Sequence, residues 1–461
     1  MKWQRLAVAV AATAVAALRL ATRARLPDDW DSVGFVAAVE RFDLTTFQPH
    51  FPGYPVYVAL TRVAHALGLS PLDAATSVSA VASAATAAAL WRLGAALVDA
   101  RAGFVALALW AGALEPWLVG GAALSDATAT AFAVGAFAAL TFEGAPAALL
   151  AGAAMALAVG TRASYWPLAL SFAVVVARAW PRHRRGVAIG GVLSTAGWLV
   201  PFVSVVGLRP LFAAGRTQLS GHFAEWGGAV TTRPDVGARV AAFARDLLYD
   251  GLWAHLGALV PALLLVALLL LAPRPRLPPQ ARAVAAIIVV PYGLWALLAQ
   301  NVIAQPRHLL PLIAASVLAL GCAAARRPWV GAALAVAAFA ASTGPMASRA
   351  QVPPAAVQVA RALAAAHPLR DEAVVFGARS ARLMALAAPS LHVATAARVS
   401  EVLGALERFD VLPRHIYVTS ELVDDDPAQV STADDRLQRC RDRRLDRQSP
   451  CLALRSYSLR Q

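Results

Sequence analysis

The sequence is short of charged residues for its length. Only 15% of its 461 residues are charged, whereas about a quarter are charged in an average soluble chain. It contains no glycine-rich phosphate loop, no nucleophile elbow and no HExxH pattern, which excludes the enzyme classes that those motifs define. Its three cysteines form no Cys/His cluster with zinc spacing, so a zinc-finger scaffold is excluded as well.

Apolar residues take the place of the missing charge. Hydrophobic residues make up 59% of the chain, and the mean hydropathy is +0.59. They form repeated stretches of roughly 17 to 25 residues, the length that crosses a bilayer as a helix. The sequence therefore predicts an all-α multi-pass membrane protein with about eleven transmembrane helices. After an N-terminal apolar run at 6–18, the predicted spans are 72–98, 102–119, 121–141, 145–161, 164–180, 186–206, 251–272, 283–300, 308–325 and 328–345.

The N-terminal run has two interpretations. It follows a basic end and precedes Arg19 and Arg23, a pattern that favours an uncleaved first span. A cleaved signal peptide is the alternative, because the run is short. Either interpretation places residue 26 outside, so the predicted topology does not depend on the choice.

The formal charge of +14 is explained by the predicted membrane topology, because many of the arginines lie in loops between the spans. Short arginine-rich clusters at 178–185, 273–276 and 326–327 all fall on one side of the predicted membrane, as the positive-inside rule requires of cytoplasmic loops. This distribution argues against nucleic acid as a partner. It predicts a protein of the cell (inner) membrane, with outer loops at 26–71 and 207–250.

The chain changes character after residue 346. Short strand-like segments at 373–377, 415–422 and 451–459 alternate with helical patterns. We therefore expect a transmembrane region at 1–346 and a small extracytoplasmic α/β domain at 347–461. Cys440 and Cys451 flank a polar stretch of that domain, and a disulfide between them is compatible with an oxidising compartment.

An acidic cluster follows the first span. LPDDWDSVGF (26–35) contains Asp28, Asp29 and Asp31. The next segment, 33–67, is too polar to span and is predicted to lie in the membrane interface; it contains the proline-rich stretch HFPGYP (50–55). By themselves, the three aspartates are explained by a water boundary or a helix cap.

Together with two later motifs, this segment resembles the GT-C superfamily of membrane glycosyltransferases. The later motifs are LSDATATAFAV (124–134) and QPRHLLPL (305–312). The superfamily uses polyprenyl-phosphate sugars and includes the dolichyl-phosphate-mannose-protein mannosyltransferase and aminoarabinose transferase types. Two positions depart from its pattern, because Ser32 follows Asp31 where an Asp-Glu pair is common, and His308 replaces a tyrosine.

The resemblance implies an inverting transfer of a sugar from a polyprenyl-phosphate donor to an extracytoplasmic hydroxyl on a lipid, glycan or protein. One aspartate of the first outer loop acts as the base in such an enzyme. Asp31 is the expected base, Asp29 is the alternative, and Asp28 is the expected helix-edge residue. Asp126 opens a span from the outer side and is interpreted either as an N-terminal cap or as a second carboxylate that orients acceptor or metal.

Cationic residues of the outer side are expected to bind the donor phosphate. Arg162, Arg307 and His308 interrupt apolar sequence there, and arginine matches phosphate geometry in a bidentate way. Snorkelling to the interface is the structural alternative for the two arginines. His50 and Tyr54 are expected to contact acceptor or to shape the loop.

No cofactor is firmly implied, although a divalent metal is compatible with the sequence. His222 and Glu225 have the spacing of half a metal site without further ligands. A transporter or flippase of a lipid-linked sugar is the competing function. It would place polar residues deep within the spans, whereas the charged candidates here gather at one face. A third possibility is a sensor or scaffold whose working part is the C-terminal domain.

Overall fold

The structure is a computed structural model of the chain, in which two compact units are distinguished. The first unit comprises Met1–Arg23 and Gly34–Ala347, and the second comprises Ala24–Val33 and Ser348–Gln461. The residues that the structure describes are 2–225, 228–252, 279–303, 305–368, 372–407, 409, 412–426, 429–430, 438–442, 444–446 and 450–458.

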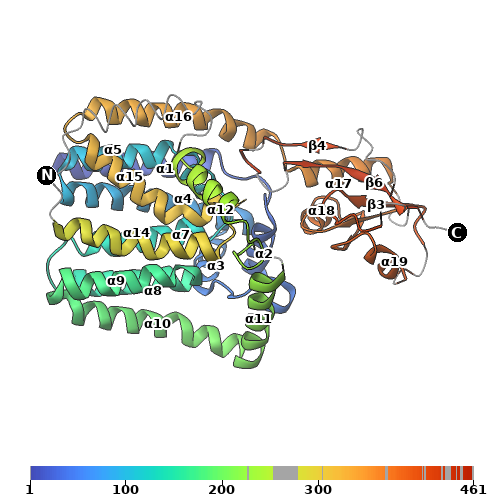
Figure 1. Ribbon diagram of the computed structural model, residues 1–461, viewed down its shortest axis with the longest axis horizontal. Helices are drawn as coiled ribbons and strands as arrows, with labels where there is room; N and C mark the ends of the chain where they lie inside the picture. Colours follow the sequence, from blue (N-terminus) through green and yellow to red (C-terminus); the bar gives the residue numbers. More distant parts are fainter. Residues whose placement is uncertain are drawn as a thin grey trace. The chain divides into compact units, whose positions relative to one another are not determined.

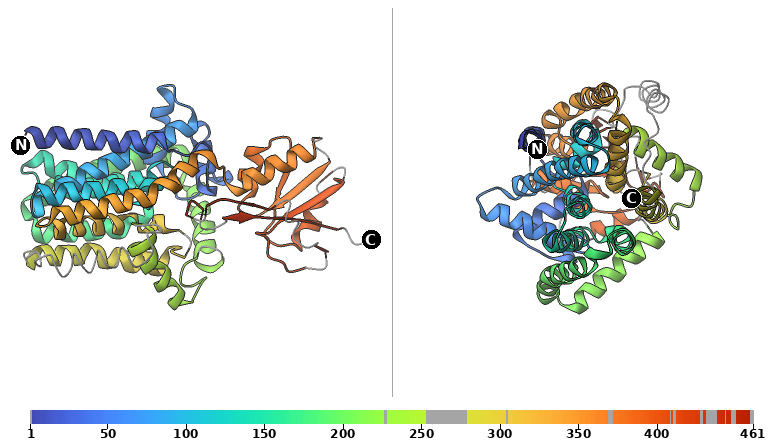
Figure 2. Two further views of the ribbon diagram at one scale, coloured as in Figure 1. Left: turned by 90° about the horizontal axis from the view of Figure 1, so that it is seen from above. Right: turned by 90° about the vertical axis from the view of Figure 1, so that its left-hand side faces the viewer.

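The first unit is built around a bundle of helices that run roughly parallel to one another, as the end-on view shows (Figure 2), whereas the helix at 208–220 lies across their direction (Figure 1). Its helices are α1 (Lys2–Ala21), α3 (Pro55–Ala66), α4 (Pro71–Leu97), α5 (Ala100–Gly112), α6 (Leu114–Gly120), α7 (Asp126–Ala139), α8 (Ala145–Thr161), α9 (Trp166–Ala179), α10 (Arg184–Val206), α11 (Leu208–Ser220), α12 (Val236–Arg245), α14 (Pro279–Ala299) and α15 (Leu310–Ala324). Two helices, α2 (Trp30–Glu40) and α16 (Pro328–Gln351), contribute residues to both units.

The helices confirm a helical membrane protein. Among the described residues, five helices are long and apolar enough to cross a membrane, or six if the bent pair α5–α6 is one span. Four shorter apolar helices coincide with further predicted spans. The predicted span at 251–272 lies almost wholly outside the described residues, so the count of about eleven stays a prediction.

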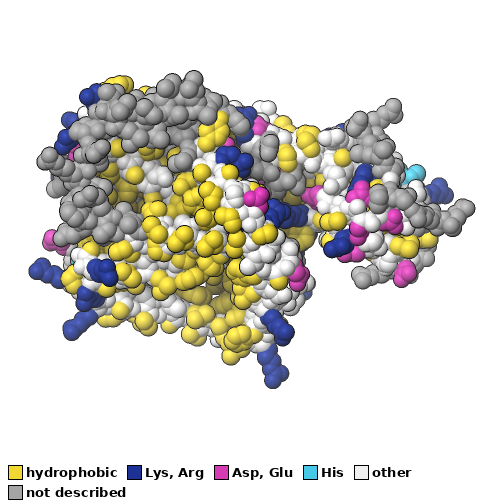
Figure 3. Space-filling model, viewed as in Figure 1, with side chains coloured by type: hydrophobic (Ala, Val, Ile, Leu, Met, Phe, Trp, Pro, Cys, Tyr) yellow, Lys and Arg dark blue, Asp and Glu magenta, His cyan; other side chains and the backbone are white. Residues whose placement is uncertain are grey.

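The lipid-facing surface is apolar. Hydrophobic side chains cover much of the visible face of the bundle (Figure 3). On α10, Val192 and Leu193 are 69% and 66% exposed, which water would disfavour and lipid tolerates. Figure 1 shows the connections α4–α5, α9–α10 and α15–α16 at the end of the bundle that carries the N-terminus. The basic clusters at 178–185 and 326–327 therefore share one end, although which side of the membrane it faces stays a prediction.

The predicted span at 102–119 is a broken helix. The chain bends by 66° between α5 and α6, which frees backbone carbonyls from helical bonds. Buried Arg19 donates to the carbonyls of Trp110 (3.1 Å) and Ala111 (2.9 Å), and Ser342 donates to that of Gly112 (2.8 Å). Side chains thus form hydrogen bonds with backbone carbonyls that water cannot reach inside a membrane. Because these side chains are distant in sequence, the hydropathy of the 102–119 run alone does not predict the break.

The closest helix packing in the bundle involves glycines of α8 and α10. A Cβ atom at Gly152 would lie 2.0 Å from the carbonyl oxygen of Val187, and one at Gly190 would lie 2.1 Å from that of Leu149. Small residues let helix backbones approach in this way where no hydrophobic driving force acts between helices.

The second unit contains a four-stranded sheet in the order β2-β1-β3-β6. Strand β1 is parallel to β2 and β3, whereas β3 and β6 are antiparallel. The strands are β1 (Ala373–Gly377), β2 (His392–Thr395), β3 (His415–Thr419) and β6 (Leu454–Ser456), with a separate pair β4 (Arg439–Cys440) and β5 (Cys451–Leu452). The predicted strand at 373–377 is confirmed, and those at 415–422 and 451–459 contain β3 and β5–β6.

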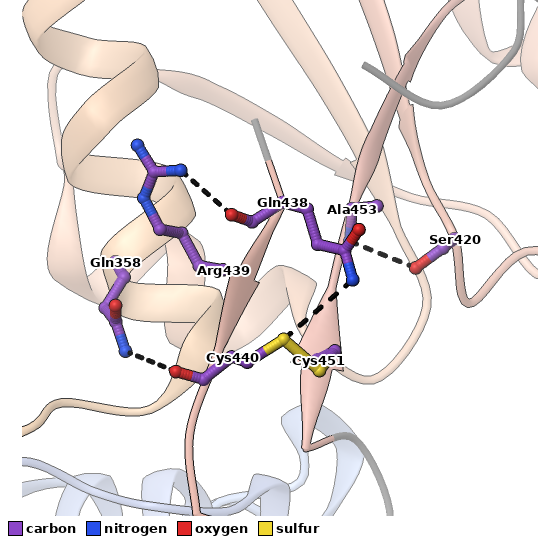
Figure 4. The surroundings of a disulfide bond; sticks show 7 residues. All are labelled: Gln358, Ser420, Gln438, Arg439, Cys440, Cys451 and Ala453. Carbon is purple, nitrogen blue, oxygen red and sulfur yellow. Dashed lines mark hydrogen bonds between the residues drawn. A yellow bond between two sulfur atoms is a disulfide. The ribbon is translucent and has the colours of Figure 1, made fainter. Parts of the chain in front are cut away.

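Helices cover both faces of this sheet. Val375 of β1 packs with residues of α17 (Ala355–Ala366) and α18 (Ala381–Ala387), whereas its neighbours Val374 and Phe376 pack with α19 (Glu401–Leu406). Alternate side chains of a strand point to opposite faces, which explains this division. A disulfide joins Cys440 to Cys451 across the β4–β5 pair (Figure 4).

We expect Gly190→Ala to lower the free energy of unfolding by about 1–3 kcal/mol, because the added methyl group forces α8 and α10 apart. Gly197→Ala is the matched control on the same helix, since a Cβ there meets nothing within 4 Å. It should be neutral or stabilising by up to about 1 kcal/mol through helix propensity. Thermal unfolding of both variants in detergent measures the difference, and equal melting temperatures would contradict the packing described.

Candidate active site

A buried ion pair lies where α7 begins and α8 ends. Asp126 is the first residue of α7 and is fully buried, and Arg162 is the C-terminal cap of α8 and is 7% exposed. Arg162 Nη1 lies 3.2 Å from Asp126 Oδ2 and donates to Ser125 Oγ at 3.4 Å. Both charges suit the helix dipoles, because an anion is favoured at a helix N-terminus and a cation at a C-terminus.

The pair retains unused hydrogen-bonding capacity. Neither carboxylate oxygen of Asp126, nor Nε of Arg162, forms a hydrogen bond with any described residue. Buried polar atoms in folded proteins are nearly always hydrogen-bonded to protein, water or ligand. The arrangement therefore suits the binding of a polar ligand at this end of the bundle.

A second buried guanidinium adds positive charge. Arg307 lies in η6 (Pro306–Leu309) and is 6% exposed. It is within electrostatic range of Arg162, as are Asp126 and Tyr54. The cluster thus contains two guanidinium groups, whose planar donors match the geometry of an anionic ligand such as a phosphate. His308 follows Arg307 in the same turn.

Tyrosines connect the elements that carry these residues. Tyr165, in η2 (Ala163–Tyr165), forms a 2.8 Å hydrogen bond with Thr130 of α7. Its ring lies 5.7 Å from that of Tyr292 of α14, whose hydroxyl donates to the carbonyl of His308 at 3.0 Å. Neither tyrosine belongs to the predicted site, and the sequence signal that points to them is a tyrosine inside an apolar run.

The proline-rich loop lies beside the cluster. His50 Nε2 and Tyr54 Oη are 2.6 Å apart, and the rings of both pack against Phe35. Gly53 has a φ of +90°, and a Cβ there would lie 2.9 Å from the ring of Phe202. Glycine is therefore needed for this turn, which carries Tyr54 into electrostatic range of Arg162.

An apolar cavity of about 740 Å³ adjoins the same loop. Gly160 and Ala163, which flank Arg162 in the chain, form part of its wall. Its lining is otherwise mostly aromatic and aliphatic: Phe51, Pro52, Pro55, Val159, Trp198, Leu199, Phe202, Leu211, Phe212, Gly215, Arg216, Leu219 and Ser220. The cavity suits an apolar chain rather than a sugar.

The three aspartates of the opening motif belong to the second unit, and each has a partner there. Asp28 forms a 2.7 Å ion pair with Arg349. Asp29 Oδ1 accepts from the backbone N–H of Ser32 at 3.0 Å, as a helix cap does. Burial lowers the pKa of Arg382, whereas the nearby charge of Asp31 opposes that shift.

These placements separate the predicted site residues into two groups. The structure brings Asp126, Arg162, Arg307 and Tyr54 together in the first unit. Asp31 and Asp29 belong to the second unit, and the assignment of one of them as base stays a prediction. Among the described residues, His222 and Glu225 are not part of a group of side chains that could hold a metal ion. The Nε2 atom of His222 instead lies 2.6 Å from the carbonyl oxygen of Ala299.

Glu115 is a further buried acid that the sequence analysis did not single out. It lies in α6, after the break of the helix, and is 4% exposed. Its backbone N–H donates to the carbonyl of Gly251 at 3.1 Å. The break between α5 and α6 places this acid in the protein interior. No periodicity in the sequence predicts that position.

The fold is that of the GT-C glycosyltransferases. A crystal structure of ArnT from Cupriavidus metallidurans bound to undecaprenyl phosphate is similar over 99% of this chain and 98% of that one, with a TM-score of 0.56 and 15% identity. Apo ArnT from the same organism is similar over 91% and 92%, with a TM-score of 0.54 and 15% identity. No family model and no curated protein matches the sequence.

The buried pair predicts a strong coupling. Asp126→Ala leaves Arg162 as an uncompensated buried charge and should destabilise the protein by about 3–5 kcal/mol. Adding Arg162→Met should restore part of that loss, because the interaction energy of contacting residues is about 0.5–3 kcal/mol. Unfolding of the single and double variants in detergent measures the coupling.

Arg92→Met is the control for this cycle. Arg92 is part-buried and bonds Thr141 rather than an acid, so its effect should add to that of Asp126→Ala. If the effects of Asp126→Ala and Arg162→Met on the free energy of unfolding were also strictly additive, this result would contradict an interaction between the two residues.

Proposed function

We propose that the protein is an integral membrane glycosyltransferase that moves a sugar from a polyprenyl-phosphate-linked donor to a hydroxyl acceptor. The observation that carries the proposal is the buried cluster of Asp126, Arg162 and Arg307 beside an apolar cavity at one end of a GT-C fold. The undecaprenyl phosphate bound in the similar ArnT structure supports this choice of donor.

The two arginines stabilise the leaving group. When the bond from the anomeric carbon to the phosphate oxygen breaks, the electron pair remains on the polyprenyl phosphate. Guanidinium groups bind such an oxyanion through short, charge-assisted hydrogen bonds. Arg162 and Arg307 are nearly buried, and electrostatic stabilisation is stronger there than in water. Asp126 holds Arg162 in place and prevents it from becoming a lone buried cation.

The apolar cavity accommodates the prenyl chain next to the phosphate. Its walls include Trp198 and Phe202 of α10 and Phe212 of α11. Burial of apolar surface contributes about 25 cal/mol per Å², so a long chain gains considerable affinity without polar contacts. Two glycines, at 160 and 215, contribute to its lining.

An aspartate of the first outer loop acts on the acceptor. Asp31 takes the proton of the acceptor hydroxyl, whose oxygen attacks the anomeric carbon as the phosphate leaves, and Asp29 is the alternative base. One displacement of this kind inverts the configuration and needs no covalent enzyme intermediate. This assignment rests on the resemblance of WDSVGF to the acidic motif of the superfamily.

The proposed location and orientation of the protein follow from the membrane topology that the arginine clusters predict. We propose that the protein lies in the cell (inner) membrane, with the second unit outside and available to select a lipid, glycan or protein acceptor. A divalent metal is compatible with Asp126, whose oxygens accept no hydrogen bond among the described residues. Transfer should therefore be measured with and without a chelator.

Transfer of labelled sugar from polyprenyl-phosphate donors by purified protein tests the proposal. Asp31→Asn should lower the rate by about 10²–10⁴, as expected for loss of a general base. Arg162→Ala and Arg307→Ala should each lower it by about 10²–10³, by analogy with loss of one oxyanion donor.

Asp43→Asn and Arg92→Ala are the matched controls. Asp43 caps a short helix of the same outer loop, and Arg92 bonds Thr141 away from the cluster; both variants should retain activity. Full transfer by both Asp31→Asn and Asp29→Asn would refute the base assignment. Movement of donor lipid between leaflets without transfer would favour the flippase instead.

A further inference from the structure

We propose that the second unit binds a divalent transition-metal ion of the zinc class through His367, Glu372 and His415. One ligand atom of each residue lies within 4.8 Å of the other two. The proposal goes beyond glycosyl transfer, since none of the three residues takes part in that chemistry.

The backbone fixes two of the three ligands beside each other. Strands β1 and β3 are parallel, with Ala373 opposite His415. Immediately before β1, the carbonyl of Glu372 accepts a 3.0 Å hydrogen bond from the N–H of His415. Both side chains therefore start from neighbouring positions at one end of the sheet.

His367 enters from the end of α17. It is the C-terminal cap residue of that helix, and its N–H donates to the carbonyl of Leu363 at 2.9 Å. Its ring centroid lies 4.6 Å from that of His415. The cluster thus joins a helix terminus to two strands of the sheet, which are rigid elements on which a metal site holds its geometry.

The imidazole of His367 is oriented by a neighbour, as in established metal sites. Its Nε2 lies 3.0 Å from the hydroxyl of Tyr417, and a bond of this kind normally sets the tautomer of a metal-binding histidine. Its Nδ1 lies 4.0 Å from Glu372 Oε1 and has no hydrogen-bond partner among the described residues. The side chain is only 12% exposed, so that nitrogen is poorly hydrated.

These positions call for a cation between Nδ1 and the carboxylate. In the tautomer whose Nε2 donates its proton to Tyr417, the lone pair of Nδ1 lies 4.0 Å from the carboxylate of Glu372, and a metal ion attracts both groups. Two nitrogens and one oxygen are the ligand set that zinc prefers over magnesium or calcium. With bonds of about 2.0–2.2 Å, tetrahedral ligands lie roughly 3.3 Å apart, so small side-chain rotations close the site. His415 is exposed and provides the route of entry.

Zinc titration of the metal-stripped, full-length protein in detergent, against a chromophoric chelator, tests the proposal. Wild-type protein should bind one zinc ion per chain at this site. The variants His367→Ala, Glu372→Gln and His415→Ala should each weaken that binding at least 10-fold. Tyr417→Phe removes only the hydrogen bond to His367 and should weaken binding about 10- to 100-fold. Cobalt should give a tetrahedral absorption band that the same variants lose.

His392→Ala and His222→Ala are the controls. His392 lies in β2 of the same sheet, and His222 lies in the first unit; neither variant should change the affinity. Circular dichroism of each metal-free variant checks the fold, and Glu372→Gln keeps the size of the side chain.

Wild-type affinity in His367→Ala and Glu372→Gln would overturn the proposal, as would loss of binding only in His222→Ala. Absence of zinc binding by the wild type would overturn it as well.

Discussion

The pairing of Asp126 with Arg162 is the interaction on which the functional end of the bundle depends. An unpaired buried charge costs several kcal/mol, so each residue of the pair offsets the burial of the other. The pair fixes the start of α7 against the end of α8, and the tyrosines of η2 and α14 extend that order to η6. In the proposed function, a guanidinium held in this way is already oriented for the donor phosphate, which reduces the reorganisation needed on binding.

The same rule of buried polar groups shapes the rest of the bundle. Arg19 reaches the carbonyls freed at the α5–α6 break, and the break turns Glu115 into the interior. In the second unit, Asp28 and Arg349 form another largely buried ion pair. The buried polar side chains of the described residues thus replace lost backbone bonds, form ion pairs or gather at the candidate site.

The sequence predicted the helices and strands of this fold better than the contacts between them. The span at 145–161 and the strand at 373–377 coincide with α8 and β1, because apolar length and periodicity determine such elements locally. The span at 102–119 is broken, since its bend depends on Arg19, which is distant in sequence. The resemblance singled out Asp126 and Arg307, and Arg162 was predicted because it interrupts apolar sequence on the outer side. Tyr165 and Tyr292 gain meaning only when α14 packs against η2.

An experimental structure with a polyprenyl phosphate bound tests the central claim most directly. The account predicts the phosphate within hydrogen-bond distance, about 2.7–2.9 Å, of the guanidinium groups of Arg162 and Arg307. It predicts the prenyl chain in the cavity lined by Trp198 and Phe202. A phosphate bound at the opposite end of the bundle, near the basic cluster at 178–185, with the Asp126–Arg162 pair unaltered, would contradict it.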